Sequence, residues 1–158
     1  MQIVWFKRDL RVVDHQALTH AIKHGPFIAL YILEPMLWQQ PDMSRRHYDF
    51  LCESLLDLKK HLEQLGCPLI IRVGDAVDVL STLIQRYSVT VLLSHQETWN
   101  GWTYRRDIAV KRCLKQLNVA WREFQQFGVI RGLCDRDGWS RRWYRWVNQP
   151  IASCQTIA

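Results

Sequence analysis

The sequence predicts an α/β protein with a doubly wound, Rossmann-like parallel sheet and helices on both of its faces. Five short apolar runs are expected to be strands, at about residues 2–6, 27–33, 69–73, 90–94 and 120–125. The segments between them carry apolar residues three and four positions apart, as on one face of a helix. Strands that alternate with helices at this spacing form a parallel sheet with right-handed crossovers.

The first strand, Ile3 to Phe6, has no polar break, which is typical of a parallel strand covered on both faces. A charged run, Lys7-Arg8-Asp9-Leu10-Arg11, follows at once. Residues just past the carboxyl end of such a strand line the ligand crevice. These cations suit phosphate or carboxylate groups, and Asp9 is expected to orient one arginine through a bidentate pair. A salt-bridged loop without a ligand is an equally good interpretation.

The helices are predicted from their ends as well as from their apolar stripes. Asp14 is expected to cap the first helix and Gly25-Pro26 to end it. The longest helix is expected over about 44–65, followed by one that buries Val77 and Leu80 and one over about 103–117. The stripe along the longest helix is interpreted as core packing.

Composition limits the class of protein. The 158 residues suit one domain, and the net charge of +6 with a pI near 9.3 permits a polyanionic partner such as DNA. Five scattered cysteines predict reduced, mostly buried thiols of an intracellular protein, without a disulfide framework or zinc site. The sequence has neither a signal peptide nor an apolar run of membrane-spanning length, so we expect a cytoplasmic protein.

Three further groups of residues are candidates for binding. Glu34, at the end of the second strand, could accept a hydrogen bond from a heteroaromatic ring or be an ordinary loop carboxylate. The start of the longest helix offers an anion site, or only a solvated first turn, through Arg45, Arg46 and Asp49. Beside Trp99 and Trp102, a lining for a flat, polar-edged chromophore is offered by Glu97, Thr98 and Asn100.

No catalytic residue is predicted. The sequence has no nucleophile elbow, no phosphate-binding glycine loop and no metalloprotease helix. The six histidines are expected to be surface or structural residues without partners.

The opening of the chain resembles the photolyase/cryptochrome family. The match is carried by Phe6-Lys7-Arg8-Asp9-Leu10-Arg11, then Asp14-His15 and Ala17-Leu18, and it continues to about Trp139. The resemblance implies the strand order 3-2-1-4-5, with the family's N-terminal α/β domain over 1–134 and the start of an inter-domain linker over 135–158. It also implies a crevice between residues 7–11 and 96–102.

In that family the crevice can hold an antenna chromophore, which is a folate, a deazaflavin or a flavin mononucleotide. The antenna passes excitation to FAD in a separate helical C-terminal domain, which carries out light-driven DNA repair or blue-light sensing. The resemblance covers none of that domain, so we expect no light-driven dimer repair from these 158 residues alone, and DNA contact only in the full-length context.

Two alternatives stay open. One is a small nucleotide-binding α/β protein of the electron-transfer-flavoprotein or adenine-nucleotide hydrolase kind, although a glycine-rich phosphate loop is missing. The other is a non-catalytic interaction module that exposes Trp139, Trp143 and Trp146. Arginines interleave with these aromatic residues, as in single-strand nucleic-acid binding surfaces. We instead expect these tryptophans to fold back onto the domain or to form an interface that meets a second copy or a helical FAD domain, and a structureless tail over 151–158.

Overall fold

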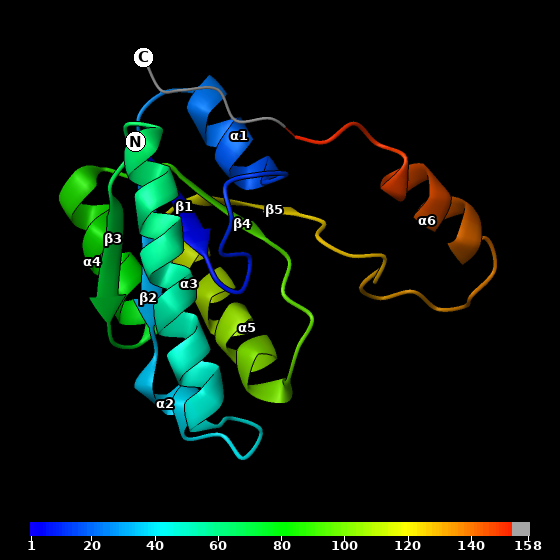
Figure 1. The fold of residues 1–158 in the computed structure, drawn as a ribbon, viewed down its shortest axis with the longest axis horizontal. Coiled ribbons are helices and arrows are strands. Elements are labelled where there is room, and N and C mark those ends of the chain that lie inside the picture. The colour runs from blue at the N-terminus through cyan, green and yellow to red at the C-terminus, as the bar shows by residue number, and fades with distance from the viewer. Residues whose placement is uncertain (153–158) are drawn as a thin grey trace.

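The structure is a computed structural model that describes residues 1–152. Its centre is a five-stranded, all-parallel sheet in the order β3-β2-β1-β4-β5 (Figure 1). The strands are β1 (Gln2–Phe6), β2 (Phe27–Leu33), β3 (Leu69–Val73), β4 (Val91–His95) and β5 (Ala120–Phe124). The predicted fold class and strand order are confirmed, and no strand is displaced by more than one residue at either end.

Helices cover both faces of the sheet. They are α1 (Gln16–Lys23), α2 (Pro35–Trp38), α3 (Arg45–Gln64), α4 (Ala76–Tyr87), α5 (Gly101–Gln116) and α6 (Trp139–Val147). Neither α2, a single turn, nor α6 is predicted from the sequence. Figure 1 shows α6 on an extension beyond the sheet and its covering helices. No helix in residues 1–152 is both long and apolar enough to cross a membrane.

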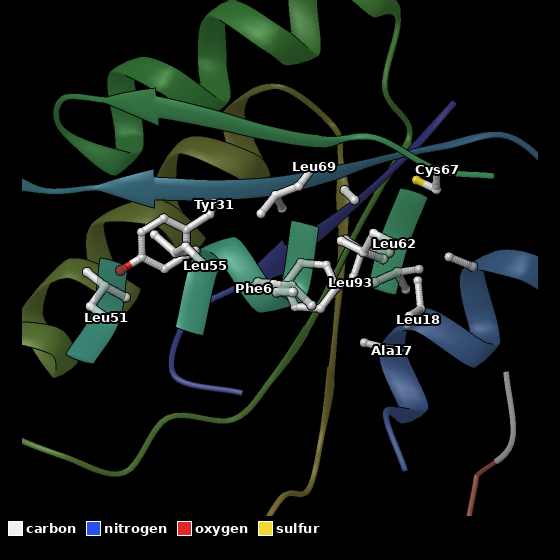
Figure 2. Close-up of a cluster of buried hydrophobic side chains, with 14 residues drawn as sticks. Phe6, Ala17, Leu18, Tyr31, Leu51, Leu55, Leu62, Cys67, Leu69 and Leu93 are labelled. Carbon is white, nitrogen blue, oxygen red and sulfur yellow. The ribbon is translucent and has the colours of Figure 1, made fainter. Parts of the chain in front are cut away.

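β1 separates the two halves of the core. Val4 and Phe6 point towards α1 and α3, whereas Ile3 and Trp5 point towards α4 and α5, and all four are at most 1% exposed. Figure 2 shows Phe6 among the side chains of the first half, with leucines of α3 and α1 around it. Burying side chains of this size stabilises the fold by about 1.5–3 kcal/mol each. An uninterrupted apolar run is therefore what this central position requires.

Two details of the prediction were wrong. Asp14 does not cap α1: it has a φ of 51°, and the side chain of His15 accepts the hydrogen bond from the Leu18 N–H instead. The four described cysteines are free, but only Cys67 is buried, since Cys52 and Cys134 are exposed and Cys113 is intermediate. The expected tail over 151–158 falls largely on residues 153–158, outside the described residues.

Candidate functional site

The carboxyl ends of β2, β1 and β4 lie side by side and bring distant residues together. Lys7 follows β1, Glu34 follows β2, and Glu97 comes two residues after β4. Because parallel strands all end at one edge of the sheet, these side chains meet where ligands bind in open α/β sheets. Arg106 reaches the same place from the second turn of α5.

Arg106 is the centre of a buried charge cluster. Its Nη1 donates to Glu34 Oε2 at 2.8 Å, and its Nη2 donates to Glu97 and, at 2.8 Å, to Asp107 Oδ1. Lys7 Nζ lies 3.4 Å from Asp107 Oδ2. Both cations also lie over the buried Trp5 ring, at 5.0 Å for Lys7 and 4.9 Å for Arg106 from the ring centroid. We call Lys7, Glu34, Glu97, Arg106 and Asp107 the Arg106 cluster.

The Arg106 cluster holds three carboxylates and two buried cations, a third cation, the partly exposed Arg131, lies 3.7 Å from Asp107 Oδ2, and one carboxylate oxygen is unpaired. Glu34 Oε1 is buried with no hydrogen-bond partner. Burial raises the pKa of Glu34 to about 7, even though Arg106 acts in the opposite direction. Burial alone would lower the pKa of Arg106, but Glu97, Glu34 and Asp107 raise it. The guanidinium therefore stays charged while Glu34 exchanges a proton near neutral pH.

A second buried cluster lies beside the first and is centred on Asp9. Its Oδ1 accepts from the Lys7 backbone N–H at 2.9 Å. Its Oδ2 lies 2.6 Å from His95 Nδ1 and 2.8 Å from His15 Nε2, the latter off the line of a straight hydrogen bond. Burial would raise the pKa of Asp9, but contacts with both histidines hold it well below its ordinary value. The predicted bidentate pair between Asp9 and an arginine was therefore wrong.

Asp9, His15 and His95 could in principle hold a metal ion, because their ligand atoms lie within 4.8 Å of one another. The proton positions argue against it. His15 Nδ1 accepts from the Leu18 N–H at 3.0 Å, so in the neutral ring Nε2 carries the proton and faces Asp9. Burial lowers the pKa of His15, which keeps the ring neutral. The Asp9 cluster is thus a structural tie between the ends of β1 and β4 and the start of α1.

A cavity of about 570 Å³ opens beside the Arg106 cluster. Its wall comes from the ends of β1 and β2, from α2, from the first turns of α3, and from Glu97 and Trp99. Aromatic rings contribute much of that wall: Trp5, Phe6, Tyr31, Trp38, Phe50 and Trp99. Polar side chains border it at Lys7, Arg8, Arg11, Glu34, Asp42, His47, Ser54, Glu97 and Arg106. Its size and mixed lining are those of small-molecule sites.

The predicted site residues divide into three groups. Arg8, Glu34 and Glu97 line the cavity, and the Arg8 guanidinium lies 4.1 Å over the Trp99 ring. Arg45 and Asp49 lie beside a smaller hollow that shares Trp38 with the cavity, and they form an exposed ion pair at 3.7 Å. Arg46, Thr98 and Asn100 line neither space, and Asn100 instead caps α5 and donates to Asp42 at 2.9 Å.

The sequence predicted Asp9, but not Arg106 at the centre of the other cluster, nor the two histidines beside Asp9. Arg106 is one of several arginines on a helix that looks basic and exposed, and nothing local separates it from the exposed Arg105. His15 and His95 do have partners, contrary to the expectation for histidines. Their one signal was position, because His95 is the last residue of the buried strand β4 and His15 directly precedes a buried helix face.

The segment after β5 folds around its tryptophans. The rings of Trp139 and Trp143 stack with centroids 6.0 Å apart, and Trp143 and Trp146 follow at 5.4 Å. Trp139 Nε1 donates to Gly128 O at 2.9 Å. A Cβ at Gly128 would lie 2.2 Å from the Trp143 ring, so only glycine allows this approach. The tryptophans thus pack on the 125–130 loop and not on the sheet.

Comparison with protein families gives a match to the model described as DNA photolyase, over residues 2–130. The cryptochrome DASH of Gloeobacter violaceus is 33% identical over 129 residues, which are 77% of this chain and 25% of that protein. The deoxyribodipyrimidine photo-lyase of Vibrio cholerae is 31% identical over 135 residues, which are 82% of this chain and 29% of that protein. The chain therefore spans between a quarter and a third of these relatives.

Solved structures give the same picture. A bacterial class III photolyase from Agrobacterium tumefaciens matches with a TM-score of 0.75 and 28% identity, over 87% of this chain and 28% of that one. An archaeal photolyase from Sulfolobus tokodaii, described with two FAD molecules and a novel light-harvesting cofactor, matches 99% of this chain and 37% of that one. Its TM-score is 0.76 at 19% identity, a likeness of fold alone.

Proposed function

Because this chain belongs to the DNA photolyase family, we propose that it is the antenna domain of a light-driven flavoprotein. In this proposal the cavity beside the Arg106 cluster binds a flat aromatic chromophore of the folate, deazaflavin or flavin class. The chromophore passes its excitation to FAD held elsewhere in the protein, which repairs DNA or senses blue light. The protein acts in the cytoplasm, where its free thiols stay reduced.

The observation that carries the proposal is the combination of aromatic walls and cationic rim in one cavity. Phe50 and Trp99 offer faces and edges against which a planar ring can pack, since aromatic pairs favour offset-stacked or edge-to-face arrangements. Arg8 and Arg11 lie at the same cavity and suit the phosphate or carboxylate of such chromophores. The smaller hollow with Arg45 extends this cationic rim past Trp38.

The proposal is tested by titrating the purified chain with flavin mononucleotide, a deazaflavin and a folate. Quenching of tryptophan fluorescence reports binding, because Trp5 and Trp99 line the cavity. We expect saturable binding of at least one chromophore. Arg8→Ala should weaken it by about tenfold or more, the equivalent of one charge-assisted hydrogen bond.

Arg86→Ala is the matched control, because Arg86 lies on α4 and lines neither cavity nor hollow. Its affinity should equal that of the wild type. If none of the three chromophores saturates the chain, or if Arg8→Ala and Arg86→Ala bind alike, the antenna proposal is wrong.

We also propose that α6 and its flanks form a packing surface for a helical FAD-binding domain or for a second copy of the chain. Support comes from the exposed apolar side chains there, since Tyr144 is 64% and Val147 48% exposed. The competing role is nucleic-acid binding through Arg136, Arg141, Arg142 and Arg145, which form none of the ion pairs found in residues 1–152.

Salt dependence separates the two roles. A packing surface predicts little affinity for single-stranded DNA and measurable self-association. Binding of several phosphates would instead weaken steeply as salt rises. Tight, salt-dependent DNA binding that disappears when residues 135–158 are deleted would contradict the packing role.

A further inference from the structure

The exposed side of α5 carries a row of cations. Val110 and Leu114 of this helix are buried in the core, and the opposite side of the helix faces solvent. Four exposed basic residues lie on that side: Arg105, Lys111, Arg112 and Lys115. They share it because seven residues make about two turns and residues three or four apart are neighbours. The row is about 15 Å long, at about 1.5 Å per residue. We call these four residues the α5 strip.

The α5 strip has no counter-charge. None of its four side chains forms an ion pair within residues 1–152. The one acidic residue of α5, Asp107, is buried and points into the Arg106 cluster. The elements packed against α5 add Asp78 of α4 and Glu123 of β5. Glu123 pairs with Arg131, and Asp78 forms no ion pair in the described part of the chain.

The longest helix, α3, treats its exposed charges differently. Three ion pairs join residues four apart along it: Arg45 with Asp49, Asp57 with His61, and Lys59 with Glu63. In the α5 strip, Lys115 instead lies four residues from Lys111 and three from Arg112, where like charges repel each other. The helix gains no stability from this arrangement. An anionic partner would neutralise the α5 strip, as the carboxylates of α3 neutralise the cations there.

We propose that the α5 strip binds the sugar–phosphate backbone of a nucleic-acid duplex without reading its sequence. Cations that neutralise phosphates release the counterions condensed on the nucleic acid, which favours binding. The guanidinium groups of Arg105 and Arg112 suit bidentate contacts with phosphate oxygens, and the lysines add point charges. Contacts of this kind carry no sequence information, because they do not touch the base edges.

The other side chains on this face of α5 favour a duplex over other anionic partners. Unpaired bases bind on rows of aromatic side chains, and α5 has one exposed aromatic residue, Tyr104. Protein interfaces have an apolar centre, whereas the largest apolar side chain within the α5 strip is the half-buried Ile108. The phosphates of a duplex require neither feature. The proposal depends on neither the cavity nor the antenna function, and it concerns a helix other than α6.

The test is a fluorescence-anisotropy titration of a short labelled duplex DNA with the full chain, over a series of salt concentrations. Four phosphate contacts predict that the logarithm of the association constant falls with the logarithm of the salt concentration, with a slope of about −3.6. The double variant Arg112→Gln, Lys115→Gln should bind about tenfold or more weakly at low salt. Its slope should be smaller in magnitude by about 2.

The matched control is the double variant Lys59→Gln, Lys60→Gln, which removes the same charge from the exposed side of α3. It should bind like wild type. Arg141→Gln, Arg142→Gln tests the arginines of α6 in the same way and should also bind like wild type. Thermal unfolding shows whether each variant is folded. The proposal is overturned if wild type does not bind the duplex at low salt, or if either of these variants loses as much affinity as the α5 double variant.

Competition separates the duplex from other polyanions. An unlabelled single strand and poly-glutamate, each at the same total charge as the duplex, should displace the labelled duplex less well than unlabelled duplex does. Equal or better displacement by the single strand would overturn the preference for a duplex. Equal or better displacement by poly-glutamate would assign the α5 strip to an acidic protein and overturn the proposal.

Discussion

Two buried polar clusters lie next to each other at the carboxyl edge of the sheet, and they differ in the ratio of carboxylates to hydrogen-bond donors and cations. In the Asp9 cluster one carboxylate accepts hydrogen bonds from the Lys7 backbone N–H and from His95, so both of its oxygens are engaged, and His15 Nε2 lies 2.8 Å away without a straight hydrogen bond. In the Arg106 cluster three carboxylates share the buried Arg106 and Lys7, the partly exposed Arg131 lies 3.7 Å from Asp107 Oδ2, and Glu34 Oε1 is left without a partner.

The state of the carboxylates distinguishes the two clusters. A buried carboxylate with both oxygens hydrogen-bonded holds its surroundings in place, whereas an unpaired buried oxygen costs free energy. The Asp9 cluster ties together β1, α1 and β4. The Arg106 cluster borders the cavity, where a ligand can complete its pairing.

The largest effect is expected from Arg106→Met. This variant leaves Glu34, Glu97 and Asp107 buried without their shared cation, which should cost about 5 kcal/mol of unfolding free energy. Arg105→Met is the control one residue away, because Arg105 is exposed and forms no ion pair in residues 1–152. It should stay within about 0.5 kcal/mol of wild type in urea unfolding. Similar losses of unfolding free energy in the two variants would show that the Arg106 cluster does not stabilise the fold.

A smaller loss, about 3 kcal/mol, is expected from Asp9→Ala. It leaves the donors of His15, His95 and Lys7 buried and unpaired. Hydrogen exchange should quicken first at Leu18, because α1 loses the group that holds its His15 cap. Asp57→Ala, an exposed carboxylate on α3, should cost no more than about 1 kcal/mol. Unchanged hydrogen exchange at Leu18 in Asp9→Ala would contradict the conclusion that the Asp9 cluster holds the start of α1.

Glu34→Gln tests the incomplete pairing through pH. Because the folded pKa of Glu34 is raised to about 7, the folded state binds more protons than the unfolded state between pH 4.5 and 7. This group therefore makes wild type less stable as pH rises through that window. Glu34→Gln lacks this titration. The unfolding free energy of the variant, relative to that of wild type, should therefore increase from pH 4.5 to 7. If the difference in unfolding free energy between the variant and wild type stays constant from pH 4.5 to 7, the raised pKa of Glu34 is contradicted.

His15→Asn should give the opposite pH response and the smallest loss. Asparagine keeps the cap on α1, so the loss at neutral pH should be about 1 kcal/mol, from the contact with Asp9. The folded pKa of His15 is lowered, so wild type loses stability as pH falls below about 6.5, where the unfolded ring takes up a proton. The variant should lose less there, as measured by urea unfolding.

The sequence was sufficient to predict the sheet and about half of the residues at the site. Unbroken apolar runs such as Ile3–Phe6 allow only a strand covered on both faces, so the sheet could be predicted. Arg8, Glu34 and Glu97 could be predicted because they directly follow strands whose ends share one edge. Arg106 could not, because its burial depends on the packing of α5 against α4 and β5, which brings its guanidinium over Trp5 and which the local sequence does not reveal.

The amphipathic α6 shows a second limit of prediction from the sequence. Its tryptophans look like an exposed strip when only sequence spacing is considered. In the structure they stack on one another and on Gly128, a contact that requires the missing side chain of a glycine eleven residues before Trp139. Such a contact between a loop and a helix follows from three-dimensional shape, and no periodicity in the sequence indicates it.

The most direct test of the account is a crystal structure of the chain grown with whichever antenna chromophore binds it most tightly. We expect the aromatic ring in the cavity lined by Trp5, Glu34 and Trp99, with Glu34 Oε1 bonded to the ligand and the Asp9 cluster unchanged. A chromophore bound elsewhere, with the cavity empty and Glu34 Oε1 still unpaired, would contradict the assignment of the two clusters.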